Sequence, residues 1–401
     1  MRPGDCRKKT REGILVREQV EFVDRRGSAS LKWDALEEIY GQKDMLGMWV
    51  ADMDFRCPAC VQEALGDYMA CGAYGYATLS GRFQDAFIRW QRERHGYEVE
   101  REWLRYSPGV VPAINWCVAS MTQPGDGVLV LPPVYFPFFQ AVEDNGRRLV
   151  ESPLVWGEDG FRIDFADLEQ KLEQVKMLIF CSPHNPVGRV WRQEELERVA
   201  ALCEAHGVLI VCDEIHQDFV YAGARHIPMG TVTRAVTLTA PSKSFNLAGL
   251  QNAVAIIPDG ELREKWDRFT KPLHLASGSS FGYLAGEAAY LRGGPWLDQV
   301  REIIYGNYQY LRTSLLERWP LLRIAPLEGT YLMWTDFSPY LAREEMKDFF
   351  EKECRLALNY GGQFRGGGES CVRWNLATSR ELVQQAAEAV HRAMEARQAG
   401  M

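Results

Sequence analysis

One lysine stands out among the residues whose chemistry could matter. Lys243 lies in the stretch TAPSKSFNLAGL (239–250), where its neighbours are small, hydroxyl-bearing or apolar and none is acidic. Burial of an ammonium group is costly, and a buried lysine relieves this cost by a lowered pKa. A lysine that can lose its proton is suited to Schiff-base chemistry with an aldehyde, whereas the alternative interpretation is a lysine on a surface turn.

Further polar side chains stand just after apolar runs. Asp213 follows VLIVC (208–212), His216 comes three residues later, and Asn185 lies in the loop after MLIFC (177–181). Each has an ordinary structural alternative: an aspartate can cap a helix, NPVG favours a turn, and a lone histidine can be an interior residue. The spacing and number of ligands in DEIHQD do not predict a metal site.

The elements that must position these side chains are short strands that alternate with helices. Between about residues 104 and 257, apolar runs alternate with helical patterns, which is typical of a largely parallel sheet covered on both faces. The carboxyl ends of parallel strands meet at one edge of the sheet, where ligands collect. We therefore expect Lys243, Asp213 and Asn185 to lie close together. The predicted strands are GVLVL (127–131), MLIFC, VLIVC, AVTLT (235–239) and AVAII (253–257), and RQEELERVAALCEAHG (192–207) is a predicted helix.

The chain has 401 residues, which is too long for one ordinary core. A long helix is predicted at 295–319, followed by strands in GTYLMWTDF and CVRWNLA that suit a smaller α+β lobe. We expect an N-terminal segment (1–55) that packs with the small domain, a large domain (56–292) and a C-terminal small domain (293–401).

Taken together, the polar residues describe one ligand. PGVVPA (108–113) opens a predicted helix whose free N–H groups could hold a phosphate. A single ligand would use all of these groups if it carried an aldehyde for the lysine, a pyridine nitrogen for the acid, a phenolic oxygen for a hydrogen-bond donor and a phosphate for the start of the helix. The sequence therefore predicts a site for pyridoxal 5′-phosphate (PLP).

Six ordered motifs carry a resemblance to a known family. In chain order they are PGVVPA, PPVYFPFF, SPHNPVGRVW, VLIVCDEIHQDF, SKSFNLAGL and VRWNLA. This order resembles the class I/II PLP-dependent aminotransferases, and MWVADMDF (48–55) and YGYATLSG (74–81) resemble their cystathionine β-lyase branch, the C–S lyases of the MalY/PatB type. The resemblance covers the chain from about residue 30. It implies the α/β fold type I of PLP-dependent transferases, with a mostly parallel seven-stranded sheet between helices in the large domain and a smaller α+β domain.

The resemblance also implies roles for single residues. Lys243 is the catalytic residue and bonds to the cofactor, and Asp213 pairs with the pyridinium nitrogen. Substrate binding falls to Arg373, whose planar fork suits a carboxylate, together with Val50 and Ala51. Tyr76 is expected to reach the phosphate of a second subunit, which implies a homodimer. The other implied cofactor-binding residues are Asn185 and His216 at the phenolic oxygen, Tyr135 on the ring, and Val110, Val111 and Ser242 toward the phosphate.

Two positions depart from the family pattern. Ala240 stands where many relatives have Ser or Thr, and Gln251 stands where the broader aminotransferases carry an arginine. The phosphate therefore lacks one usual donor and one usual charge, for which Thr239 or Ser242 could compensate.

The residues alone leave the reaction open between β-elimination at a carbon–sulfur bond and transamination of amino acids. The resemblance favours elimination, mainly through WVADMDF and DEIH. Arg373 is the one strong candidate for carboxylate recognition, with Arg365 as a weaker one, whereas a dicarboxylate transaminase needs two such sites. A third alternative is a regulatory, protein-binding role on the same fold, because the resembled branch includes a member that restrains a transcription activator.

Composition limits the partners and the location. The net charge is −8, which argues against nucleic acid as a main partner. No apolar run approaches the ~20 residues of a membrane span, and the first 15 residues lack the apolar core of a signal peptide, so we expect a cytoplasmic protein. The ten cysteines are then reduced thiols, and Cys57 and Cys60 in CPAC lack the second ligand pair that zinc needs.

Overall fold

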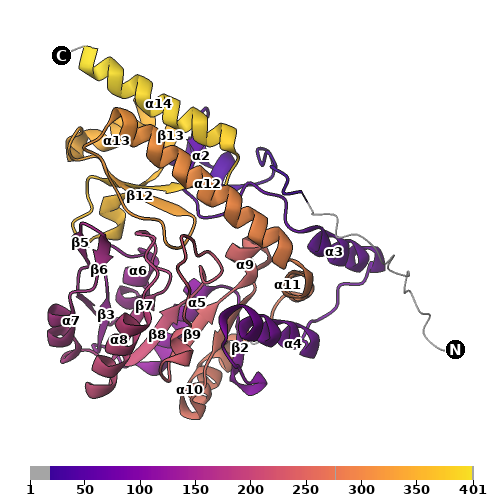
Figure 1. Cartoon of the computed structure of the whole chain (residues 1–401). Helices are drawn as coiled ribbons and strands as arrows, with labels where there is room; N and C mark the ends of the chain where they lie inside the picture. Colours follow the sequence, from indigo (N-terminus) through magenta and orange to yellow (C-terminus); the bar gives the residue numbers. More distant parts are fainter. Residues whose placement is uncertain (1–18, 276, 400–401) are drawn as a thin grey trace.

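The centre of the molecule is a seven-stranded sheet (Figure 1). The computed structural model of the chain describes residues 19–275 and 277–399, so the prediction made above for the first 15 residues lies outside the described part. In spatial order the strands are β2 (Leu104–Ser107), β10 (Ala253–Ile256), β9 (Val236–Thr239), β8 (Leu209–Asp213), β7 (Met177–Cys181), β3 (Gly127–Val130) and β4 (Arg148–Glu151). Each of the five predicted apolar runs forms one of these strands.

The sheet is mostly parallel, which confirms the predicted fold class. Only β10 runs antiparallel to its two neighbours among these strands. Its apolar run does not reveal this direction. The connection from β9 holds only two short helices, α9 (Pro241–Ser244) and a 3₁₀ turn (Ala248–Leu250), instead of the full crossover helix that usually joins parallel strands. The edge strand β4 is absent from the predicted strands, because only one of its four residues is buried.

Alternate residues of each central strand point to opposite faces of the sheet. Val128 and Val130 belong to one buried cluster, whereas Leu129 between them belongs to another. Helices therefore cover both faces, as the continuous apolar runs predict (Figure 1). The first cluster includes α5 (Val110–Met121), α6 (Pro137–Glu143) and α10 (Gly260–Thr270), and the second includes α7 (Phe165–Leu172) and the predicted helix α8 (Gln193–Ala205).

A second, antiparallel sheet forms the predicted smaller α+β unit. The long helix predicted at 295–319 is α12 (Gly294–Arg318), and it packs with the C-terminal helix α14 (Arg380–Ala399) over this sheet (Figure 1). The domain boundaries at residues 55 and 292 stay a prediction. The strand order is β11 (Arg323–Ile324), β12 (Leu332–Asp336), β15 (Cys371–Asn375) and β14 (Asn359–Tyr360).

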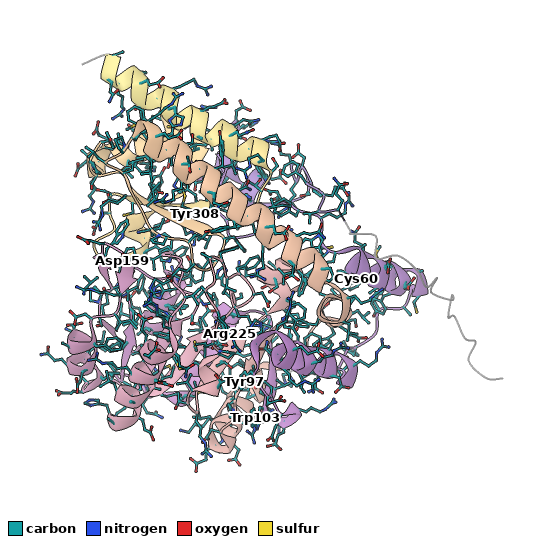
Figure 2. All side chains as sticks on the ribbon, in the orientation of Figure 1. Cys60, Tyr97, Trp103, Asp159, Arg225 and Tyr308 are labelled. Atoms are coloured by element: carbon teal, nitrogen blue, oxygen red, sulfur yellow. The ribbon has the colours of Figure 1, made fainter. Side chains whose placement is uncertain are left out.

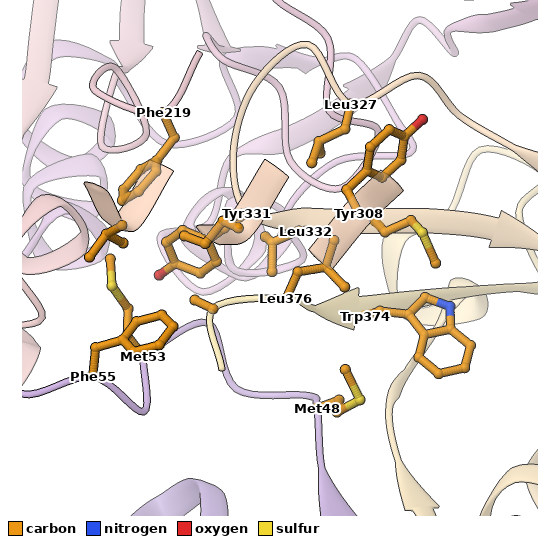
Figure 3. Close-up of a cluster of buried hydrophobic side chains, with 14 of the residues drawn as sticks. Met48, Met53, Phe55, Phe219, Tyr308, Leu327, Tyr331, Leu332, Trp374 and Leu376 are labelled. Atoms are coloured by element: carbon orange, nitrogen blue, oxygen red, sulfur yellow. The ribbon is translucent and has the colours of Figure 1, made fainter. Parts of the chain in front are cut away.

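The N-terminal segment joins the small sheet to the large one. After α1 (Leu31–Asp34) and α2 (Leu36–Tyr40), strand β1 (Leu46–Gly47) pairs in parallel with β13 (Leu356–Ala357). Residues 48–55, which we call the strap, then run to the large domain. Figure 3 shows the strap side chains of Met48, Met53 and Phe55 in one buried cluster with residues of the small sheet and with Phe219, which follows β8.

The remaining helices complete the packing around these layers. Figure 2 shows the side chains that these layers carry. Within residues 19–275 and 277–399, no helix has both the length and the apolar composition needed to cross a bilayer. The remaining α-helices and strands of the described chain are α3 (Ala59–Cys71), α4 (Gly81–Trp90), α11 (Ser280–Arg292), α13 (Met346–Asp348) and the hairpin of β5 (Val155–Gly157) and β6 (Gly160–Arg162).

Candidate active site

A cavity of about 190 Å³ opens at the carboxyl ends of the central strands. Asp213 ends β8, Asn185 follows β7, and Lys243 follows β9 on α9, so three adjacent strands bring these side chains together. The first turn of α5, which follows β2, closes the cavity. The predicted site residues that line it are Ala51, Val110, Val111, Tyr135, Asn185, Asp213, His216, Ser242 and Lys243.

Lys243 is half-buried in the wall of this cavity. Its Nζ atom donates a hydrogen bond of 2.5 Å to the carbonyl oxygen of Ala51 in the strap. Burial lowers the pKa of Lys243 to about 8, although the charges of Asp52 and Asp213 act in the opposite direction. About a tenth of the amine is therefore unprotonated at pH 7, far more than for a lysine with the ordinary pKa, and the reaction with an aldehyde requires this form.

Asp213 is a buried carboxyl group that faces the same cavity. Its Oδ1 atom accepts a hydrogen bond of 3.0 Å from the backbone N–H of Ile215. Burial raises the pKa of Asp213 to about 7, although the hydrogen bond from Ile215 and the charge of Lys243 oppose this rise. A buried acid of this kind gains most from a ligand atom that brings its own positive charge, such as a protonated ring nitrogen.

Asn185 lies in another wall of the cavity and is hydrogen-bonded to Arg373 behind it. Arg373, on β15, donates from NH1 to the Oδ1 atom of Asn185 at 3.0 Å. Because this oxygen is occupied, the amide N–H₂ of Asn185 is the group left to serve the ligand. Arg373 also donates from NH2 to the carbonyl of Trp49 at 2.9 Å, and its Nε atom has no hydrogen-bond partner in the described chain. Burial lowers the pKa of Arg373 to about 10, so it stays cationic at neutral pH.

His216 and Tyr135 supply neutral rings. Burial, together with the charges of Lys243 and Arg373, lowers the pKa of His216 well below its ordinary value, so the imidazole is uncharged. Its Nδ1 atom has no partner within the described residues, and its ring packs against that of Tyr331 in a T-shaped arrangement, with the ring centroids 5.3 Å apart. Burial raises the pKa of Tyr135, so its ring lines the cavity as a neutral phenol.

The start of α5 offers backbone donors. Gly109 caps this helix of 12 residues, and Val110 and Val111 form its first turn. The N–H groups of a first turn have no acceptor inside the helix, and the helix dipole favours an anion there. An amine for an aldehyde, an acid, an amide donor and a free helix start together fit PLP, the ligand that the sequence predicts.

Three predicted site residues lie outside the cavity wall. Tyr76 is fully exposed on the segment before α4, so its predicted role depends on a second subunit and stays a prediction. Val50 contributes its carbonyl oxygen to a hydrogen bond of 2.5 Å from Asn375. Arg373 is hydrogen-bonded to Asn185, which lines the cavity, but is not itself one of the lining residues.

Sequence reasoning missed the hydrogen bonds that hold the strap over Lys243. Tyr331 donates its hydroxyl to the carbonyl of Ala51 at 2.8 Å, and Asn375 donates to the carbonyls of Val50 and Asp52. Asn246, three residues after Lys243, also bonds the strap backbone at Met53 and Phe55. The only signal was the presence of asparagines within SKSFN and VRWN, and it does not indicate their partners.

The two departures from the family pattern lie away from the cavity wall. Ala240 is buried at the start of α9. Gln251 is exposed, and its backbone carbonyl accepts a hydrogen bond of 2.9 Å from the hydroxyl of Tyr106. No group of histidine, cysteine or acidic residues in the described ranges is arranged to hold a metal ion.

Comparisons with known proteins give one consistent assignment. The family model described as aminotransferase class I and II matches residues 43–390. The chain is 40% identical to cystathionine β-lyase PatB of Bacillus subtilis, over 90% of this chain and 95% of that one. Among solved structures, a PLP-bound putative aminotransferase from Clostridium difficile has a TM-score of 0.91 and 36% identity, covering 93% of this chain and 98% of that one. A PLP-bound C–S lyase from Staphylococcus hominis has a TM-score of 0.88 and 30% identity, covering 93% of this chain and 97% of that one. The chain belongs to the class I and II aminotransferase family.

Proposed function

We propose that this protein is a PLP-dependent C–S β-lyase that cleaves cystathionine or cysteine S-conjugates to a thiol, pyruvate and ammonia. The similarity to a cystathionine β-lyase and to a C–S lyase supports the reaction. The observation that carries the proposal is the set of cationic groups at the site. Among the described residues that line the cavity, Lys243 is the only cation, and Arg373 lies directly behind them.

The second arginine that could bind a distal carboxylate is otherwise engaged. Arg365 forms ion pairs of 3.0 Å with Glu143 and 2.6 Å with Glu151, and its guanidinium lies over Phe139. It is therefore held by two carboxylates of the large domain and does not line the cavity. A site with one available arginine binds the carboxylate next to the reacting Cα and offers no second arginine for the bare side-chain carboxylate of an aspartate- or glutamate-type substrate. The distal carboxylate of cystathionine differs from these, because an ammonium group beside it balances its charge.

Each residue of the site has a separate role in the proposed reaction. When bound, PLP supplies the electron sink for the negative charge that develops at the substrate's Cα. Asp213 would hold a proton at the ring nitrogen of the bound cofactor, and the amide of Asn185 would donate to its phenolic oxygen. Arg373 orients the substrate carboxylate, so that the amine of Lys243 can take the Cα proton as a general base. A thiolate on Cβ then leaves readily, because it is a far better leaving group than the hydroxide of serine.

The test is product formation without a keto acid. We expect the purified protein, saturated with PLP and given cystathionine, to release pyruvate over many turnovers. A transaminase would stop after one turnover, because its cofactor is left in the amine form, and 2-oxoglutarate would restart it. Such stalling with every thioether substrate would overturn the lyase proposal in favour of transamination, to which the putative aminotransferase from C. difficile points.

We further propose that the active enzyme is a homodimer in which Tyr76 reaches the phosphate of the other subunit. The exposed side chains of Tyr76, Tyr74 and Met69 support it, because large exposed apolar groups suit an interface. Tyr76→Phe and Lys243→Ala subunits, nearly inactive alone, should regain partial activity when refolded together. No recovery in proven heterodimers would contradict the role of Tyr76. A cytoplasmic location, the absence of nucleic-acid and membrane partners and a regulatory role stay predictions.

A further inference from the structure

A buried carboxylate lies behind the candidate active site. Asp213 and His216 line the cavity, whereas Asp218, two residues farther along, does not. In the same way Lys243 lines the cavity while its neighbour Ser244 does not. Ser244 and Asp218 are both buried, and the Ser244 hydroxyl donates to the Oδ2 atom of Asp218.

Asp218 links its own segment, which follows β8, to two other segments of the chain. Besides Ser244, which ends α9, it binds His95 and Trp90 through its Oδ1 atom, at 2.9 Å from Nε2 and 3.1 Å from Nε1. Trp90 ends α4, and His95 ends the π-helical turn (Gln91–His95) that follows it. Burial raises the pKa of Asp218, but the hydrogen bonds from His95 and Ser244 contribute to a net lowering. Asp218 is therefore an ionised acceptor shared by three donors.

The helix that carries Lys243 needs such an anchor. α9 is a single turn of four residues, and its N-cap residue Ala240 provides no side-chain hydrogen bond. Helices this short are not stable by themselves and depend on tertiary contacts. Within α9, the side-chain hydrogen bonds to other segments come from Lys243 itself and from Ser244.

We propose that Asp218 is a positioning residue that holds Ser244, and through it α9, so that the amine of Lys243 lies where it can take the substrate's proton. The kinetic part of this inference rests on the proposed function. The effect of Asp218 on the amine of Lys243 does not rest on the proposed function, because the titration of that amine can be followed in the cofactor-free protein.

The most selective variant is Ser244→Ala, because it removes one hydroxyl and leaves His95 and Trp90 bound to Asp218. We expect kcat to fall about 10- to 100-fold with KM changed less than about threefold, since small displacements of a catalytic group cost on the order of 10²-fold. Asp218→Asn replaces one acceptor oxygen of the carboxylate by an amide N–H₂, which cannot accept a hydrogen bond from these donors. It should therefore lower kcat similarly. The double variant should lose no more than the worse single one, because both act through one hydrogen bond.

The second measurement is the pH dependence of acetic anhydride labelling of Lys243 in the cofactor-free protein, followed by mass spectrometry. In the wild type the labelling midpoint should lie near the pKa of about 8. In Ser244→Ala the midpoint should rise toward the ordinary value, because a loosened α9 lets the amine regain water. This result does not depend on any lyase activity, so it distinguishes failure of this inference from failure of the proposed function.

A matched control lies in the small domain. There Ser314 and the Nε2 atom of His391 share a hydrogen bond of 2.9 Å, and Trp319 donates to the other ring nitrogen of His391 at 2.9 Å. Ser314→Ala should lower stability and leave kcat and the labelling midpoint of Lys243 unchanged. If Ser244→Ala behaves as Ser314→Ala does, or if Asp218→Asn lowers kcat while Ser244→Ala does not, the proposed route through Ser244 is overturned. Should Asp218→Asn not fold, Ser244→Ala alone decides.

Discussion

The Nζ atom of Lys243 and the carbonyl oxygen of Ala51 are joined by a hydrogen bond of 2.5 Å, although the two residues are 192 positions apart in the chain. The hydroxyl of Tyr331 donates to the same oxygen at 2.8 Å, from the side of the small sheet. The strap therefore lies over the amine and is held from both sides. The strap shields the amine from water on one side, and burial lowers its pKa, although the hydrogen bond to the carbonyl oxygen by itself favours the charged form.

Lys243→Met should stabilise the cofactor-free protein near neutral pH. The pKa of Lys243 is about 8 in the folded protein against an ordinary value of 10.5. Between these values the unfolded chain binds more protons than the folded chain, so the stability of the wild type rises with pH in that window. Below pH 8 both states are protonated, and the folded state bears the full cost of the buried ammonium. The Tm of the variant should therefore exceed that of the wild type at pH 7, and the difference should shrink toward pH 10.

Thermal unfolding of cofactor-free protein across this pH range is the measurement. Lys271→Met, which changes an exposed lysine, should show no such trend. A Tm difference for Lys243→Met that stays constant from pH 7 to pH 10 would contradict the lowered pKa.

Lys243 should be the only lysine that bonds to the cofactor. Borohydride treatment of the PLP-loaded protein, followed by peptide mapping, should find the cofactor attached to Lys243. Lys243→Ala should still bind some PLP without a covalent bond, and its kcat should fall by at least about 10²–10⁴-fold, the usual contribution of a general base. An adduct on any other lysine would refute the assignment.

Asp213→Ala should cost more activity than Asn185→Ala. Loss of Asp213 removes a buried charge that acts on the ring nitrogen, and preorganised electrostatic groups contribute about 10²–10³-fold to kcat. Loss of Asn185 removes a neutral hydrogen bond to the ligand, which contributes about 1 kcal/mol, or roughly fivefold. Steady-state kinetics at saturating PLP separates the two, and an equal loss would show that Asp213 acts only as a hydrogen-bond acceptor.

The sequence predicts the part of the site that lies on the central sheet. It does not predict the contacts that the N-terminal segment makes with this part. Asp213, Asn185 and Lys243 could be predicted to lie together because each follows a buried strand, and adjacent parallel strands fix their spacing. The contact of Lys243 with Ala51 could not, because it depends on how the N-terminal segment crosses from the small sheet. The antiparallel direction of β10 was hidden for a similar reason, since an apolar run reports burial and carries no direction.

The buried ion pair of Lys32 and Asp54 should be necessary for the strap to stay in place. Their charged atoms lie 2.6 Å apart, both side chains are fully buried, and Asp54 belongs to the strap. Asp54 also accepts a hydrogen bond of 2.8 Å from the indole of Trp33, but Arg25, the other cation near it, is 3.7 Å away. Lys32→Met would leave a buried carboxylate without its close cation, and the loss of one partner of a buried pair costs about 3–5 kcal/mol.

Urea unfolding of the PLP-loaded protein measures this cost. Lys43→Met is the matched control, because Lys43 pairs with Glu37 at 3.2 Å on the exposed surface, where such a pair contributes less than about 1 kcal/mol. We expect Lys32→Met to lower the free energy of unfolding by several times the effect of the control and also to raise KM, because the strap carries Val50 and Ala51 beside the proposed substrate site. Equal losses in the two variants would mean that the strap is held by Tyr331, Asn375 and Asn246 without help from the ion pair.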